Sequence, residues 1–319
     1  MKNLDAVPRP AVLIAGPTAS GKTAFALELA KEFGGVIINA DSMQVYAELR
    51  IITNRPTPEE EAAAPHRLYG FRPASEAYST ALWLAHVAAE LNDAPAREQL
   101  PILVGGTGLY FKALTEGLSA IPSIPSDIRD HYRRAAQKSG ADALHAELTR
   151  RDPATASRLR PTDTQRLVRA LEVLEGTGRP LSDWQVEKQP PLLPLSQTYP
   201  ISLMVERDEL YKRCDARFDA MLNDGVIEEA RSIEALALSP ALPAMRAVGL
   251  PPLLAYLRRD LSLEEAGTAA KTATRNYAKR QLTWIRNNFI TWKSSNEQEK
   301  ERTKSEINRF IKYRLTSAR

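Results

Sequence analysis

A glycine-rich octapeptide that joins an apolar run to a helical pattern limits most strongly how this chain can fold. It follows the apolar run 11–15, precedes the helical run 24–30, and consists of Gly16, Pro17, Thr18, Ala19, Ser20, Gly21, Lys22 and Thr23. Small residues let backbone N–H groups turn around anionic oxygens, and the following helix presents its positive end to them. Lys22 adds a mobile cation, and Thr23 offers a hydroxyl to Mg²⁺. The pattern predicts a P-loop that holds a diphosphate or triphosphate; the alternative is a tight strand-to-helix turn with a chance lysine.

The first third of the chain alternates apolar runs with helical patterns, which is typical of a parallel sheet covered by helices. We expect strands at 11–15, 36–39 and 102–104, and helices at 22–32 and 79–91. From 123 to about 187 the pattern changes to short arginine-rich helices, and a proline-rich stretch then leads to another strand at 201–205. The fold class expected is therefore α/β, a P-loop NTPase-like parallel sheet with flanking helices and an inserted all-helical lobe.

This pattern divides the chain into three parts. We expect a P-loop transferase core at 1–118 and 200–293, a helical insertion at 119–199, and a charged C-terminal tail at 294–319. Ile307, Phe310 and Ile311 give the tail the spacing of an amphipathic helix, but its charge equally allows fraying or disorder.

Composition excludes several classes of protein. The chain has 319 residues and 43% hydrophobic content, enough for a substantial core. Its one cysteine, Cys214, rules out an internal disulfide and a cysteine-cluster zinc site, which fits a reducing compartment. The four histidines show no metal-ligand spacing. No stretch has the length and apolarity of a membrane span or a signal peptide, so we expect a cytoplasmic protein, in monomeric form.

Positive charge concentrates between Lys271 and Lys293, where six basic residues occur without an acidic one. Aromatic residues are interleaved among them, namely Tyr277, Trp284, Phe289 and Trp292. Cations mixed with aromatic rings suit phosphate neutralisation combined with base stacking, which predicts a polyanionic partner. The alternative is a solvated basic helix face whose aromatic residues belong to the core.

Two further segments follow expected strands and so lie at the edge of the sheet where the P-loop lies. Asp41 follows the second strand and can bind Mg²⁺ through water, act as a general base, or cap a turn. Gly105-Gly106-Thr107-Gly108 follows the third strand and allows backbone to approach a ligand closely, or simply makes a glycine-rich turn. The strand-end aspartate of many ATP-hydrolysing proteins is missing there, which weakens an ATPase interpretation.

Several arginines are candidate anion ligands. Gln165, Arg166 and Arg169 share an expected helix, and their spacing places both guanidinium groups on one face. Arg217 comes shortly after the chain returns to the sheet. Solvated surface arginines are the alternative for each of them.

Together these segments resemble the tRNA dimethylallyltransferase family in its bacterial form. The resemblance extends through most of 11–286 and is carried by five motifs, at 16–23, 41–46, 101–110, 166–173 and 274–284. It implies transfer of a dimethylallyl group from dimethylallyl diphosphate to the exocyclic N6 amine of the adenosine next to the anticodon of tRNA, with release of diphosphate. The partners implied are therefore the tRNA anticodon stem-loop and dimethylallyl diphosphate, with Mg²⁺ as cofactor.

The resemblance also implies residue roles. Asp41 is the general base, Thr23 and Mg²⁺ attend the diphosphate, and Lys22 and Arg217 neutralise the leaving group. The implied tRNA contacts, to which the basic stretch adds Lys279 and Arg280, are Asp41, Ser42, Met43, Gln44, Thr107, Arg129, Gln165, Arg166, Leu167, Val168 and Arg169.

The chain departs from the family pattern in places. Where the family usually has Asp-Ile-Gly-Thr-Ala-Lys-Pro-Thr, residues 50–57 read Arg-Ile-Ile-Thr-Asn-Arg-Pro-Thr, so Ile52 replaces a glycine. Paired histidines appear as Pro65-His66-Arg67, and a Gly-Tyr-Lys stretch as Gly249-Leu250-Pro251. The remaining alternatives are a small nucleotide or metabolite kinase, in which Asp41 would activate a hydroxyl, and a protein that only binds tRNA.

Overall fold

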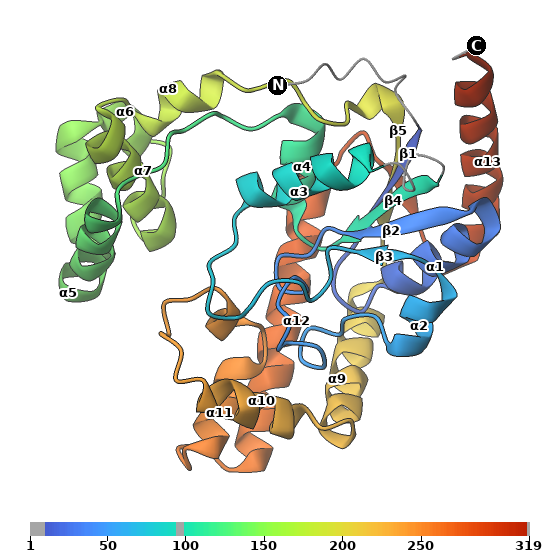
Figure 1. Cartoon of the computed structure of the whole chain (residues 1–319). Coiled ribbons are helices and arrows are strands. Elements are labelled where there is room, and N and C mark those ends of the chain that lie inside the picture. Colours follow the sequence, from blue (N-terminus) through green and yellow to red (C-terminus); the bar gives the residue numbers. More distant parts are fainter. Residues whose placement is uncertain (1–9, 94–98, 318–319) are drawn as a thin grey trace. The chain divides into compact units, whose positions relative to one another are not determined.

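The computed structural model describes residues 10–93 and 99–317, which form two compact units (Figure 1). The larger unit contains the described residues up to Thr115 and from Leu192 onward, and the smaller one is Glu116–Pro191. The larger unit carries the P-loop and is therefore described first. Parts of the expected core and tail, at 1–9, 94–98 and 318–319, lie outside the described residues.

A parallel sheet of six strands forms the centre of the larger unit, in the order β3-β2-β4-β1-β5-β6. Because the strands run in one direction, their carboxyl ends meet at one edge, where the P-loop follows β1. This confirms the predicted α/β fold class. The strands are β1 Ala11–Ala15, β2 Gly35–Asn39, β3 His66–Arg67, β4 Leu100–Gly105, β5 Thr198–Leu203 and β6 Lys293–Ser295.

The sheet is covered on both faces, which explains why its central strands are continuous apolar runs. Helices α1 (Lys22–Phe33) and α13 (Lys300–Ser317) pack on one face. Helices α3 (Thr80–Asn92) and α4 (Gly108–Glu116) pack on the other, together with the end of α12 (Leu263–Asn288). Every residue of β1 is buried as a result.

The helices that follow β5 build a second core of the larger unit. Helices α9, α10, α11 and α12 pack around Phe218, Leu250 and Ala270, and the segment 45–52 joins them there. This core therefore lies beside the loop that follows β2. The helices of the larger unit not yet bounded are α2 Pro58–Ala63, α9 Arg207–Asn223, α10 Val226–Ala235 and α11 Leu250–Leu257.

The structure differs from the strand predictions most at β5 and at the two edges of the sheet. The fourth strand was expected at 201–205 but runs over Thr198–Leu203, with Pro200 inside it. The missing N–H of Pro200 is tolerated because β6 pairs with β5 only from Ile201 onward. Strands β3 and β6 were not predicted, because two or three polar residues at a sheet edge carry no apolar pattern.

The C-terminal segment belongs to the larger unit. After β6, α13 buries Ile307 against the sheet, with Phe310 and Ile311 packed beside it. Of the alternatives left open for this segment, the amphipathic helix is the one the structure contains, because its apolar stripe covers one sheet face.

The smaller unit is all helical in its regular elements. Its core consists of Tyr132, Leu148 and Leu171 with their neighbours. Gly140 interrupts α5 with a positive φ of 74°. The helices are α5 Ser126–Arg151, α6 Pro153–Ala156, α7 Thr164–Thr177 and α8 Leu181–Val186. Across both units, none of the described helices is long and apolar enough to span a bilayer.

Candidate active site

The P-loop octapeptide forms the turn between β1 and α1. Two of its residues have left-handed backbone, Ala19 with φ 63° and Gly21 with φ 82°, and Ser20 N–H donates to the Pro17 carbonyl at 3.2 Å. Left-handed residues within such a turn can direct N–H groups inward, and α1 adds the positive end of its dipole. The turn therefore has the geometry of an anion cradle.

Two half-buried cations adjoin this turn. Lys22 Nζ donates to the Pro17 carbonyl at 3.2 Å, and desolvation lowers the pKa of Lys22 to about 8, although Asp41 opposes that shift. Arg217, on α9, donates from Nη2 to Thr18 Oγ1 at 2.5 Å, and burial lowers the pKa of its guanidinium. Cations in a poorly solvated site attract a diphosphate much more strongly than solvated ones.

A residue that the sequence did not single out fixes the loop from α12. The Gln281 side chain accepts from Thr18 N–H at 2.8 Å and donates to the Gly106 carbonyl at 3.0 Å. It thus connects the P-loop with the glycine-rich turn after β4. Only 6% of Gln281 is exposed. Its role depends on contacts far apart in the sequence, so no local signal could have revealed it.

Asp41 is positioned by hydrogen bonds of its own backbone and side chain. Its N–H donates to Asn39 Oδ1 at 2.8 Å, and its Oδ1 accepts from Met43 N–H at 2.9 Å. The next residue, Ser42, donates its N–H to Thr107 Oγ1 at 3.0 Å. The turns after β2 and β4 approach so closely that a Cβ on Gly105 would lie 2.0 Å from the Ala40 carbonyl oxygen, so this position requires glycine.

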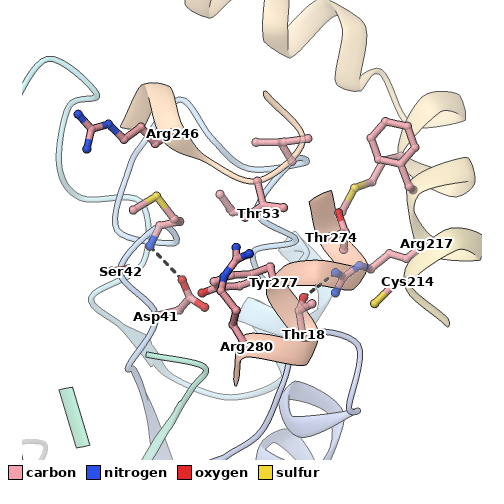
Figure 2. Close-up of a pocket in the computed structure, with 15 residues that line it drawn as sticks. Thr18, Asp41, Ser42, Thr53, Cys214, Arg217, Arg246, Thr274, Tyr277 and Arg280 are labelled. Atoms are coloured by element: carbon pink, nitrogen blue, oxygen red, sulfur yellow. Dashed lines mark hydrogen bonds between the residues drawn. The ribbon is translucent and has the colours of Figure 1, made fainter. Parts of the chain in front are cut away.

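A cavity of about 240 Å³ lies where these segments meet, and Figure 2 shows Asp41 on one side of it with Thr18 and Arg217 nearby. The cavity thus brings together the predicted base and parts of the predicted diphosphate site. Its remaining lining residues are Ser42, Met43, Ile52, Thr53, Cys214, Phe218, Met221, Arg246, Val248, Thr274, Tyr277 and Arg280. Phe218, Met221, Arg246 and Val248 had not been selected from the sequence, because they come from a loop and a helix without a motif of their own.

The expected tRNA contacts fall into two groups. Ser42, Met43 and Arg280 line the cavity of the larger unit. The Gln44 amide instead donates to the carbonyls of Thr53 and Asn54, both at 2.9 Å, so this side chain is already engaged within the protein.

The second group lies on the smaller unit. Arg129 is on α5, while Gln165, Arg166, Val168 and Arg169 are on α7. Arg166 pairs with Asp163 at 3.3 Å and Arg169 with Glu172 at 3.4 Å, so both guanidinium groups have partners within their helix. Leu167 is fully buried in the core of this unit, so its side chain cannot contact RNA, contrary to the expectation.

The basic stretch is only partly available to a polyanion. Lys271 pairs with Asp219 and Arg275 with Asp215, both at 2.6 Å, and Lys293 pairs with Glu306. Within 10–93 and 99–317, no ion pair joins Lys279, Arg280 or Arg286 to an acid, so these three carry the exposed charge.

For the aromatic residues of this stretch, stacking on bases and a place in the core were the two alternatives, and for two of them the structure contains the second. Phe289 and Trp292 are buried and stack on each other with ring centroids 3.9 Å apart. They belong to the core beneath the sheet. Trp284 is half-buried and packs against Gly108, where a Cβ would lie 2.1 Å from its ring. Tyr277 alone of the four lines the cavity.

Comparison with known families and structures gives a consistent result. The family model described as IPP transferase matches residues 44–288, and the one described as isopentenyl transferase matches residues 10–76. A tRNA dimethylallyltransferase from Nitrobacter hamburgensis is 55% identical over 91% of this chain and 92% of its own length. One from Parvibaculum lavamentivorans is 51% identical over 94% and 95%.

Solved structures agree with the sequence comparison. A full-length tRNA isopentenylpyrophosphate transferase from Bacillus halodurans superposes with a TM-score of 0.69 at 32% identity, covering 97% of this chain and 98% of that one. A eukaryotic dimethylallyltransferase acting on tRNA gives 0.74 at 29% identity, covering 87% of this chain and 70% of that one. With the family model matching most of its length and relatives above half identity, the chain belongs to the tRNA dimethylallyltransferase family.

Proposed function

We propose that this protein transfers a dimethylallyl group from dimethylallyl diphosphate to the N6 amine of the adenosine on the 3′ side of the anticodon in tRNA. Membership of the tRNA dimethylallyltransferase family supports prenyl transfer to a tRNA adenosine. One structural observation carries the detailed assignment. Asp41, a candidate base, lines the same cavity as Thr18 and Arg217, which belong to the anion cradle.

The reaction breaks the bond between the allylic carbon and its diphosphate oxygen and forms a bond from that carbon to N6. Negative charge then accumulates on the departing diphosphate, and Lys22, Arg217 and the positive end of α1 stabilise it. Because these groups are fixed before the substrate binds, little reorganisation is needed during the reaction. Asp41 accepts the proton that the amine loses, which leaves the neutral N6-dimethylallyl product.

We assign Mg²⁺ a place beside Thr23. The described residues contain no group of three or more His, Cys, Asp or Glu side chains that could hold a metal ion alone. The residues nonetheless fit Mg²⁺, which often binds through few protein oxygens and completes its coordination with substrate phosphates and water. Thr23 lies in the first turn of α1, so its hydroxyl is the proposed protein ligand. Mg²⁺ would supply charge compensation for the diphosphate.

For tRNA we propose contacts on both units. Ser42, Met43, Lys279 and Arg280 in the larger unit, with Thr107 supporting Ser42, would receive the target base and its flanking phosphates. Arg129, Gln165, Arg166, Val168 and Arg169 in the smaller unit would bind the anticodon stem-loop. The adenine must leave its stack for N6 to reach the allylic carbon, as in other enzymes that modify bases. We propose the cytoplasm as the compartment and a monomer as the active form.

The test is the mass of the anticodon-loop fragment after incubation of tRNA with enzyme and dimethylallyl diphosphate. We expect the fragment to gain one dimethylallyl group and free diphosphate to appear in equal amount. A parallel reaction with ATP in place of the prenyl donor should leave the fragment unchanged. Consumption of ATP on addition of tRNA would support a kinase instead, and the absence of any product with either donor would leave only tRNA binding.

A further inference from the structure

The lining of the candidate active-site cavity contains both polar and apolar side chains. Thr18 and Arg217 line it at the P-loop, and its other polar lining includes Asp41, Thr53, Arg246 and Arg280. Its apolar lining comes from Met43, Ile52, Phe218, Met221 and Val248. A prenyl diphosphate anchored by its diphosphate at the P-loop has a hydrocarbon tail that gains free energy by contact with these apolar side chains. The room that they leave therefore limits the length of the tail.

Ile52 is a member of this wall with little room to move. Its side chain is 8% exposed and belongs to the core built by α9 to α12. Gly249 packs against the Ile52 side chain so closely that a Cβ added to this glycine would lie only 3.0 Å from Ile52 Cδ1. The same Cβ would lie 3.7 Å from the Phe218 ring. The side chain is thus enclosed between the cavity in front and packed residues behind, and interiors packed in this way resist displacement.

The backbone around Ile52 is fixed as well. The Glu229 carboxylate, on α10, accepts from the N–H groups of Arg50, Ile51 and Ile52 at 2.8, 2.7 and 2.9 Å. The Gln44 amide binds the carbonyls of the two residues that follow. Figure 2 shows Thr53, the neighbour of Ile52, among the residues that line the cavity. Hydrogen bonds on both sides of Ile52 therefore hold this wall in one position.

We propose that Ile52 determines the chain length of the donor, so that the enzyme accepts a dimethylallyl diphosphate and rejects a geranyl diphosphate. This inference rests on the proposed function of the cavity. The isoleucine side chain is nearly as large as one isoprene unit, which is the difference between the two donors. Where the family usually has glycine, this chain places Ile52, so a larger side chain narrows the cavity at this position.

The test compares the two donors within each enzyme variant. For the parent, Ile52→Val, Ile52→Ala and Ile52→Gly, kcat/KM is measured with dimethylallyl and with geranyl diphosphate, using an anticodon stem-loop as acceptor. Use of geranyl relative to dimethylallyl diphosphate should rise stepwise along the series, reaching on the order of 10- to 200-fold. The ratio does not depend on the fraction of folded enzyme, and Ile52→Val keeps the series informative if the smaller residues reduce stability.

Ile51→Ala is the matched control, because Ile51 packs against the same core but does not line the cavity. Its donor ratio should equal that of the parent. A parent that uses geranyl diphosphate as well as the shorter donor would overturn the proposal, and so would a ratio that stays constant along the series. Either result leaves the proposed function standing, because that function fails only if the parent transfers no dimethylallyl group at all.

Discussion

Replacing Asp41 by Asn tests the proposed chemistry most directly. Asn keeps the size of the side chain and an Oδ1 that can still accept from Met43 N–H, the bond that spans 2.9 Å in the structure. What it loses is the second oxygen's ability to take the proton from N6. A positioned general base typically contributes a factor of about 10² to 10⁴ to the rate. The single-turnover rate of Asp41→Asn should therefore fall by about 10²- to 10⁴-fold.

The effect on donor binding should be small, because two electrostatic changes oppose each other. Loss of the Asp41 charge removes a repulsion toward the diphosphate. It also removes a charge that raises the pKa of Lys22, so less of that lysine is protonated. We therefore expect the donor dissociation constant to change by no more than about a few-fold, well below the rate effect.

The assay is rapid-quench single turnover with labelled dimethylallyl diphosphate and a saturating anticodon stem-loop. Asp219→Asn serves as the control, since it also replaces a carboxylate by an amide but lies in a half-exposed pair with Lys271. This control should transfer at the parental rate. An Asp41→Asn enzyme that stays within a few-fold of the parent would refute the base assignment, and Asp41 would then only position the site.

The remaining predictions concern the charged groups around the site. Lys22→Ala or Thr23→Ala should weaken donor binding, measured by calorimetry, while tRNA affinity stays nearly unchanged, because both residues belong to the diphosphate cradle. The pKa of Lys22 is lowered to about 8, so its ammonium form is lost as the pH rises through that value; donor affinity should fall over the same range, and Lys22→Ala should abolish that dependence. Lys279→Ala and Arg280→Ala should each reduce the slope of log tRNA affinity against log salt by roughly 0.7 to 0.9 if the residue contacts a phosphate. Lys271→Ala, whose ammonium is paired with an acid, should leave the slope unchanged.

The strands at the centre of the sheet could be predicted from the sequence because the burial of each strand is visible in its own residues. Strands β1, β2 and β4 are buried on both faces, so each is a short continuous apolar run next to a turn signal. The edge strands β3 and β6 could not be predicted in this way. They are held by backbone pairing with a neighbour, which places few demands on their side chains.

The candidate site was predictable where its residues follow strands. Asp41 and Thr107 follow β2 and β4, and parallel topology alone brings their segments together. The aromatic residues at the end of the basic stretch show the limit of such reasoning. Phe289 and Trp292 are interleaved with cations in the sequence, yet they follow the last residue of α12 and pack into the core, while Lys279 and Arg286 on the helix are exposed. Spacing in the sequence does not by itself say where a helix ends or which residues near its end are buried.

Helix α12 contributes residues both to the donor site at the P-loop and to the cavity. It can do so because its different faces carry different residues. Gln281 on its buried side holds Thr18 and the Gly106 carbonyl, and therefore the shape of the P-loop. One position earlier, Arg280 lines the cavity, and Lys279 before it is exposed to solvent. Successive residues of a helix point in directions about 100° apart, so three neighbours can serve the donor site, the cavity and the surface. A rotation or shift of α12 would move Lys279, Arg280 and Gln281 together. The packing of α12 against α9 and α11 therefore helps to fix the geometry of the candidate active site.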